Sequence, residues 1–100
     1  MTPTKTPTAS GISRLLAKSG FERATYEHGC LDQAGFAVTE AGGGAGVRVE
    51  HDTTLPDHRQ PILGRYAETI TEAGWAVEPV SYAGSAVHHL IVTAREGGHQ

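Results

Sequence analysis

The spacing of hydrophobic residues along this chain predicts two helices and two pairs of strands. Apolar residues recur every three or four positions over 12–17 and 62–73, which places them on one face of a helix. Apolar and polar residues alternate, as in strands with one buried face, over 36–39, 47–50, 75–77 and 87–93. The glycine-rich stretch Gly42–Gly46 and the turn Ser81–Ser85 separate these runs in pairs, so we predict two β-hairpins.

This series of elements predicts an α+β fold in the order α-(β)-β-β-α-β-β. We expect an antiparallel sheet of four to five strands with both helices on one face. The strand in parentheses lies between residues 21 and 34, where two interpretations stay open. Phe21–Glu27 is compatible with a strand and Cys30–Ala34 with a single helical turn, and Gly29 interrupts either one.

The ends of the chain differ in composition from its middle. The first ten residues hold no aliphatic side chain between Met1 and Ala9, so they bury too little to offset the entropy lost on ordering. We therefore expect disordered tails at 1–10 and 96–100 and a single domain over 11–95. Ser10 or Ser13 is the expected cap of the first helix. For the second helix, Asp57 and Pro61 mark two alternative starts.

Both phenylalanines and the only tryptophan follow a glycine, and an aliphatic residue precedes each aromatic by five positions. A Schellman ending needs a residue with positive φ after the last helical turn, and it brings the next residue against the side chain five positions earlier. The pattern predicts three helix exits, closed by contacts of Leu16 with Phe21, Leu31 with Phe36 and Ile70 with Trp75. Structural roles are accordingly predicted for Gly20, Phe21, Gly35, Phe36, Ile70, Gly74 and Trp75.

Two segments of the chain nearly repeat one another. Ala34–Val38 and Ala73–Val77 match at four of five positions, and each precedes a turn and another strand. An αββ unit used twice explains the match. The abundance of alanine and glycine at helix–strand junctions explains it equally well, and the sequence does not decide between the two.

Charge and composition bear on the expected partners and location. The formal net charge is −3, and the arginines are scattered, so no basic run marks a nucleic-acid or anionic-membrane surface. A single cysteine excludes an internal disulfide, and no apolar stretch approaches the ~20 residues of a membrane span. We predict a cytoplasmic protein with no membrane partner, and the charge distribution disfavours a nucleic-acid partner.

Six histidines are the natural candidates for a metal site. His88 and His89 are adjacent in a predicted strand, so their side chains are expected on opposite faces, unable to bind one ion. His51 and His58 flank a loop and are metal candidates, and His28 with Cys30 offers a second pair of ligands from a turn, but no paired CxxC or HExxH motif is present. Cys30 is expected to be a small buried side chain. We predict no metal, no other cofactor and no catalytic residues, and a small metal-dependent or thiol enzyme is the third of the three functions considered.

An RNA-binding function is the alternative that the layout favours. Ile12 through Phe21, the strand Val47–His51 and the helix ending at Gly74 resemble the double-stranded-RNA-binding fold and the HicA-type interferases built on it. The resemblance implies binding to RNA. The chain departs from that family in its acidic charge, in two additional strands, and in lacking a Gly-Ser-His catalytic strand.

A second resemblance covers most of residues 12–93. Ser13–Leu16 with Gly20 and Phe21, Tyr66–Glu68, and Ala73–Glu78 resemble short uncharacterised proteins of actinobacteria and their phages. The preference for arginine over lysine agrees with a GC-rich genome. This resemblance implies no known activity.

The last predicted strand suggests how the protein works. Val80, Leu90 and Val92 are expected on one face and Val87, His89 and Ile91 on the other, so this strand is either central in the sheet or covered by a partner. We therefore predict a small non-enzymatic binding module that acts through contact with another protein or with a second copy of itself. The candidate binding residues are Val80, Leu90, Val92 and Arg48.

Overall fold

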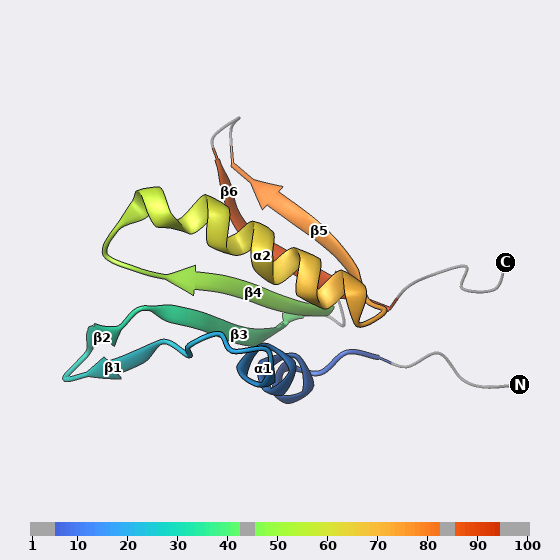
Figure 1. The fold of residues 1–100 in the computed structure, drawn as a ribbon, viewed down its shortest axis with the longest axis horizontal. Coiled ribbons are helices and arrows are strands. Elements are labelled where there is room, and N and C mark those ends of the chain that lie inside the picture. The colour runs from blue at the N-terminus through green and yellow to red at the C-terminus, as the bar shows by residue number, and fades with distance from the viewer. Residues whose placement is uncertain (1–5, 43–45, 83–85, 95–100) are drawn as a thin grey trace, which may run out of the picture.

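The computed structural model describes residues 6–42, 46–82 and 86–94, which form two α-helices and six strands (Figure 1). In chain order the elements are α1 (Ala9–Lys18), β1 (Thr25–Glu27), β2 (Cys30–Gln33), β3 (Gly35–Ala41), β4 (Gly46–Asp52), α2 (Arg59–Glu72), β5 (Ala76–Ser81) and β6 (Val87–Thr93). A short 3₁₀ helix, η2 (Pro56–His58), leads into α2.

Four strands form an antiparallel sheet in the order β3-β4-β6-β5. Both helices pack on the same face of this sheet, so the predicted α+β class is confirmed (Figure 1). Each helix precedes one hairpin of the sheet, and the second strands of the two hairpins, β4 and β6, are neighbours. Two copies of an αββ unit would form this arrangement.

The segment between α1 and β3, undecided from the sequence, forms a separate two-stranded sheet. β1 and β2 pair antiparallel around the turn His28-Gly29, whose φ angles are 54° and 80°. The helical turn considered for Cys30–Ala34 is therefore wrong. Gly29 does not interrupt an element; it completes a two-residue hairpin turn that requires positive φ at both positions. Figure 1 shows this hairpin extending past one end of the main sheet.

The hydrophobic core lies between the helices and the sheet. Helical side chains such as Leu16 and Ile70 are fully buried against strand side chains such as Val49. On the central strand β4, every second residue points into this layer, as the period of a strand requires. The core residues are Ile12, Leu16, Phe36, Val47, Val49, Leu63, Tyr66, Ile70, Leu90 and Val92.

Two of the three predicted helix exits have Schellman geometry. Gly20 and Gly74 have φ angles of 99° and 102°. The Phe21 amide donates to the Leu16 carbonyl at 3.1 Å, and the Trp75 amide donates to the Ile70 carbonyl at 3.3 Å. Both bonds connect C″ to C3, which is the defining bond of this motif.

The third predicted exit, at Gly35, is wrong. Leu31 belongs to β2 rather than to a helix, and Gly35 begins β3 without a left-handed φ. A Cβ at Gly35 would lie 2.4 Å from the Glu22 carbonyl oxygen, because residues 22–24 run directly alongside β3. Ala24 donates to the Phe36 carbonyl and Phe36 donates to the Glu22 carbonyl, each at 2.9 Å. Glycine is present here for close backbone approach.

The helix starts also differ from the predictions. Thr8 caps α1, its hydroxyl accepting from the Gly11 amide at 3.0 Å, in place of Ser10 or Ser13. The first helix and its cap thus begin inside the predicted tail 1–10. α2 begins at Arg59, between the two expected starts, and its N-cap residue His58 makes no side-chain capping bond. The loop positions 43–45 and 83–85 and the tail 96–100 lie outside the described residues.

Within the described ranges, none of the helices has the length and apolar character needed to cross a membrane.

Candidate functional site

The sheet face opposite the helices carries the candidate site, and we call it the open face. Val47 and Val49 of β4 point into the core, so the residues between and beyond them point to the other side. The same alternation, carried across the strand pairs, assigns the other members. The open face includes Ala37, Thr39, Arg48, Glu50, Glu78, Val80, His89 and Ile91, with His88 added by a bulge described below.

A row of three side chains crosses the centre of the open face. Arg48 of β4 pairs with Ile91 of β6, and Ile91 pairs with Glu78 of β5. A basic and an acidic residue therefore flank a half-buried isoleucine. Arg48 also forms an ion pair with Glu50 on its own strand, with 2.7 Å between Nε and Oε2.

Only part of the predicted binding set lies on this face. Leu90 and Val92 are 2% and 0% exposed, because β6 is a central strand and these two residues point into the core. They are not available to a partner. Val80 pairs with His89, so it shares the open face with His89 instead of lying with Leu90 and Val92. Arg48 lies on the open face as well.

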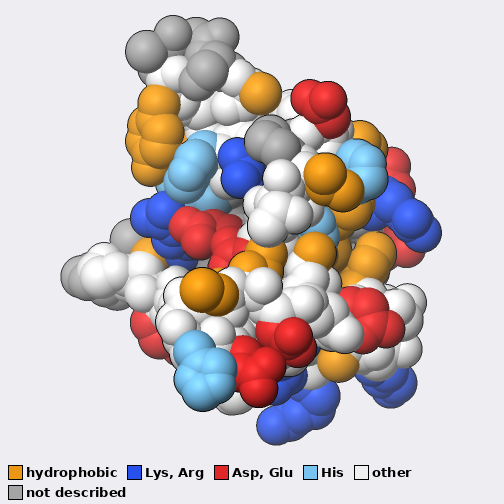
Figure 2. Space-filling view, turned by 90° about the vertical axis from the view of Figure 1, so that its left-hand side faces the viewer, with side chains coloured by type: hydrophobic (Ala, Val, Ile, Leu, Met, Phe, Trp, Pro, Cys, Tyr) orange, Lys and Arg blue, Asp and Glu red, His pale blue; other side chains and the backbone are white. Residues whose placement is uncertain are grey.

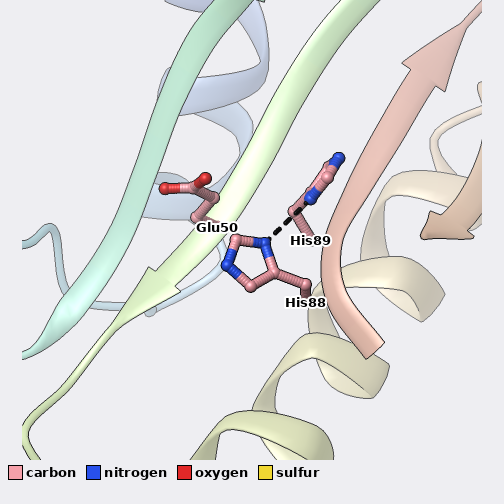
Figure 3. A group of neighbouring side chains, drawn as sticks. All are labelled: Glu50, His88 and His89. Carbon is pink, nitrogen blue, oxygen red and sulfur yellow. Dashed lines mark hydrogen bonds between the residues drawn. The ribbon is translucent and has the colours of Figure 1, made fainter. Parts of the chain in front are cut away.

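The histidine doublet lies at a β-bulge. Val80 pairs with His89 and the next residue, Ser81, pairs with Val87, which leaves His88 as an extra residue in β6. A bulge breaks the alternation of side chains and can redirect one of them. The Nδ1 atoms of His88 and His89 are only 3.1 Å apart (Figure 3). The expectation that the two rings point to opposite faces is therefore wrong.

Glu50 completes a cluster with the two histidines. One ligand atom from each of Glu50, His88 and His89 lies within 4.8 Å of the others, and no other such trio occurs among the described residues. Figure 3 shows the His88 ring between Glu50 and His89. The Tyr82 ring lies beside both histidines, with centroid distances of 5.0 and 6.0 Å. Burial, and then the charges of Arg48 and His88, lower the pKa of His89, and Glu50 acts in the opposite direction.

The histidines that the sequence analysis kept as metal candidates are not brought into a ligand trio within the described ranges. His51 is 6% exposed, and its Nδ1 shares a 2.8 Å hydrogen bond with the Tyr66 hydroxyl. Burial, followed by the charges of Arg59 and His58, lowers the pKa of His51. Burial and Asp52 raise the pKa of Tyr66. His51 and Tyr66 thus form a neutral polar pair inside the core.

A cavity of about 350 Å³ lies beside the His51–Tyr66 pair, mostly lined by apolar side chains. Phe21, Leu55 and Ile62 contribute to its walls, and Arg65 stacks over the Phe21 ring at 5.5 Å. Because the Nδ1 of His51 is engaged by Tyr66, the pair acts as a structural link between β4 and α2. We assign this cavity no chemistry.

Cys30 was expected to be buried and is exposed, because β2 belongs to the separate hairpin and packs under no helix. The Cys30 thiol is therefore accessible to solvent, unlike a thiol in the core.

Acidic and basic side chains are mixed on the surface of the molecule. Figure 2 shows acidic, basic and histidine side chains interspersed on one side of the molecule, without a continuous basic field on that side. Comparison with protein-family models, with curated proteins and with solved structures gives no match.

Proposed function

We propose that the protein is a small non-enzymatic binding module, that its open face is the contact surface, and that a second copy of the chain is the partner. The observation that carries this proposal is the row Arg48–Ile91–Glu78. It places a half-buried apolar side chain at the centre of a face that the helices do not cover. Antiparallel sheets can leave one face in water, and two such faces can also pack on each other as the layers of a β-sandwich do.

The sheet edges are less suited to contact than the face. β5 is an edge strand, and it carries Pro79 and the exposed Glu78, two features that discourage the addition of another strand. β3 is the other edge, and residues 22–24 already occupy part of it through a parallel bridge between Arg23 and Phe36. Contact through the face avoids both obstacles.

If two copies of the chain are related by a twofold axis, the charges of the central row on one copy can pair with those on the other. Such an axis, running parallel to β6 above Ile91, would exchange the two sides of the row. Arg48 of one copy would then lie opposite Glu78 of the other, twice per dimer. Isologous dimers require self-complementarity of this kind. The two isoleucines would meet on the axis, where apolar burial contributes most.

The RNA-binding alternative needs Arg14, Arg23, Arg48 and Arg65 on one face. Arg48 lies on the open face, whereas Arg65 lies on α2, on the helical side of the sheet. Nucleic-acid affinity depends mainly on clustered phosphate contacts, and arginines on opposite sides of the sheet cannot form such a cluster. No shift of duplex RNA or DNA at low salt would be expected.

Mass measurement tests the proposal. Light scattering with EDTA present should give twice the 10.5 kDa chain mass at about 100 µM, where a contact with micromolar Kd is largely formed. Arg48→Glu and Glu78→Arg should each be monomeric, because each places like charges opposite one another.

An equimolar mixture of these two variants should recover the dimer, since both charged residues of one row are then acidic, both charged residues of the other row are basic, and each faces the opposite sign. Glu68→Arg on α2 is the matched control and should remain dimeric. A monomeric native chain, or a mixture that stays monomeric while both variants melt like the native protein, would contradict the proposal.

A further inference from the structure

The Glu50–His88–His89 cluster has the ligand types of a transition-metal site. Imidazole nitrogens and carboxylate oxygens both bind Zn²⁺, and two histidines with one glutamate leave a tetrahedral ion one open position. The three residues come from neighbouring strands, β4 and β6, one or two residues beyond the last pair between them, Val49 and Leu90. Glu50 is held by its pairing with Ala37 of β3, and His89 by its pairing with Val80 of β5. A site on paired strands is more rigid than one built from loops.

The distance between the histidine nitrogens is the quantity that argues for an ion. Two nitrogens bound to one tetrahedral zinc at about 2.0–2.1 Å lie roughly 3.3 Å apart. The His88 and His89 Nδ1 atoms are 3.1 Å apart, close to that separation, so rotation of the two rings that directs both lone pairs at one point would complete the pair. The carboxylate of Glu50 must approach further, which rotation of its flexible side chain allows.

We propose that Glu50, His88 and His89 bind one divalent transition metal ion, with Zn²⁺ as the expected occupant and a fourth position open. The site is complete within one chain, so it does not depend on the proposed dimer. Arg48 holds Oε2 of Glu50, which leaves the second carboxylate oxygen for the ion. Such an outer contact orients a metal-binding carboxylate.

A hydrogen bond between His88 and His89 is the competing explanation of the short distance. In that case one Nδ1 carries a proton and the other accepts it, and only one lone pair is available. Bound metal requires both Nδ1 atoms to be unprotonated, and binding then releases protons. The two explanations predict opposite responses to added metal.

Titration of metal-free, untagged protein separates them. Calorimetry with Zn²⁺ should give one ion per chain with a Kd in the micromolar range or below, and Co²⁺ should give the visible absorption of a tetrahedral site. His88→Ala, His89→Ala and Glu50→Gln should each weaken binding more than about tenfold, since even outer contacts of metal ligands are worth about 10–100-fold.

His58→Ala and His28→Ala are the matched controls, since both remove an exposed histidine from a different part of the described chain. They should leave the affinity unchanged. His88→Gln serves as a second variant if His88→Ala disturbs the bulge, and near-native melting of each variant is the condition for using it.

Absence of Zn²⁺ binding at pH 7.5, or equal loss of binding in the His58→Ala control, would overturn the metal site. The result is independent of the dimer proposal. A monomeric variant such as Glu78→Arg should still bind one ion, and metal-free native protein should still dimerise. The metal site and the dimer can therefore be tested separately, and the failure of either one does not affect the test of the other.

Discussion

Two five-residue segments, Ala34–Val38 and Ala73–Val77, share four residues but have different structures. The glycine of the second, Gly74, ends α2 with a φ of 102°, and a Cβ there would meet no atom within 4 Å. The glycine of the first, Gly35, opens β3 without a left-handed φ, and a Cβ there would lie 2.4–2.6 Å from three backbone atoms. One position requires glycine for its conformation and the other for its size.

The aromatic residues of the two segments differ as well. Phe36 is fully buried, with its ring 6.3 Å from that of Tyr66 and the Arg23 guanidinium over it at 5.6 Å. Trp75 is half-buried at the edge of the core. The corresponding aromatic positions of the two segments therefore lie one at the centre of the domain and one at its periphery.

Truncation of the two aromatics should show the largest difference. Phe36→Ala should lower the free energy of unfolding by about 3–5 kcal/mol, because it leaves a cavity in the core. Trp75→Ala should cost about 2 kcal/mol, since part of the indole is in contact with water in the folded state. Urea unfolding of both variants, with unchanged m-values, measures the difference. A larger loss of unfolding free energy in Trp75→Ala than in Phe36→Ala would contradict the assignment of Phe36 to the centre of the core and Trp75 to its edge.

Methyl addition at Gly35 should have the next largest effect. Gly35→Ala should cost about 3 kcal/mol or more, because the clashing atoms are backbone and cannot rotate away. Faster hydrogen exchange at the Ala24 and Phe36 amides should accompany the loss, as their mutual bridge opens. Gly42→Ala is the control, since no atom lies within 4 Å of its Cβ position. Equal stability of these two variants would disprove the close-approach role.

Local features of the sequence were sufficient for much of the fold. Both main helices and both hairpins of the four-stranded sheet follow from hydrophobic period and turn residues, which act over a few positions. The exits at Gly20 and Gly74 were predictable for the same reason. At Gly35 the same residue pattern led to the wrong prediction of a helix exit. The residues that contact Gly35, Glu22–Ala24, are close to it in space but distant from it in the sequence, so the local pattern does not reveal them.

The candidate site was less accessible to sequence reasoning. The prediction for His88 and His89 assumed regular alternation, and the bulge opposite Ser81 depends on how β5 and β6 register with each other. Glu50 joins the histidines only because β6 lies next to β4, a strand order set by the packing of both hairpins. The adjacent histidines near a turn were the one available signal.

The buried polar pair beside Phe36 predicts that the stability of the protein depends on pH. Phe36 pairs with His51 across β3 and β4, and folding lowers the pKa of His51 from 6.5. The unfolded chain therefore binds this proton more tightly. Stability from neutral His51 is fully present above pH 6.5 and falls as the pH drops below that value, by at most about 1.4 kcal/mol per pH unit.

Urea unfolding between pH 7.5 and pH 5.5 measures this slope. His51→Gln should make the slope shallower, leaving the contribution of His89, whose pKa folding also lowers. If His51→Gln and the native protein lose stability in parallel, His51 is not held neutral by the fold.

The smallest expected effect concerns the helix exit at Gly74. Gly74→Ala should cost about 1 kcal/mol, because alanine disfavours the positive φ while its methyl group meets no neighbouring atom. Gly20→Ala should cost the same, since its φ of 99° and its open surroundings match those of Gly74. Gly74→Asn should cost less than Gly74→Ala, because asparagine tolerates this conformation, whereas at Gly35 asparagine should be worse than alanine. A loss at Gly74 as large as that at Gly35 would mean that space, and not conformation, selects glycine at both junctions.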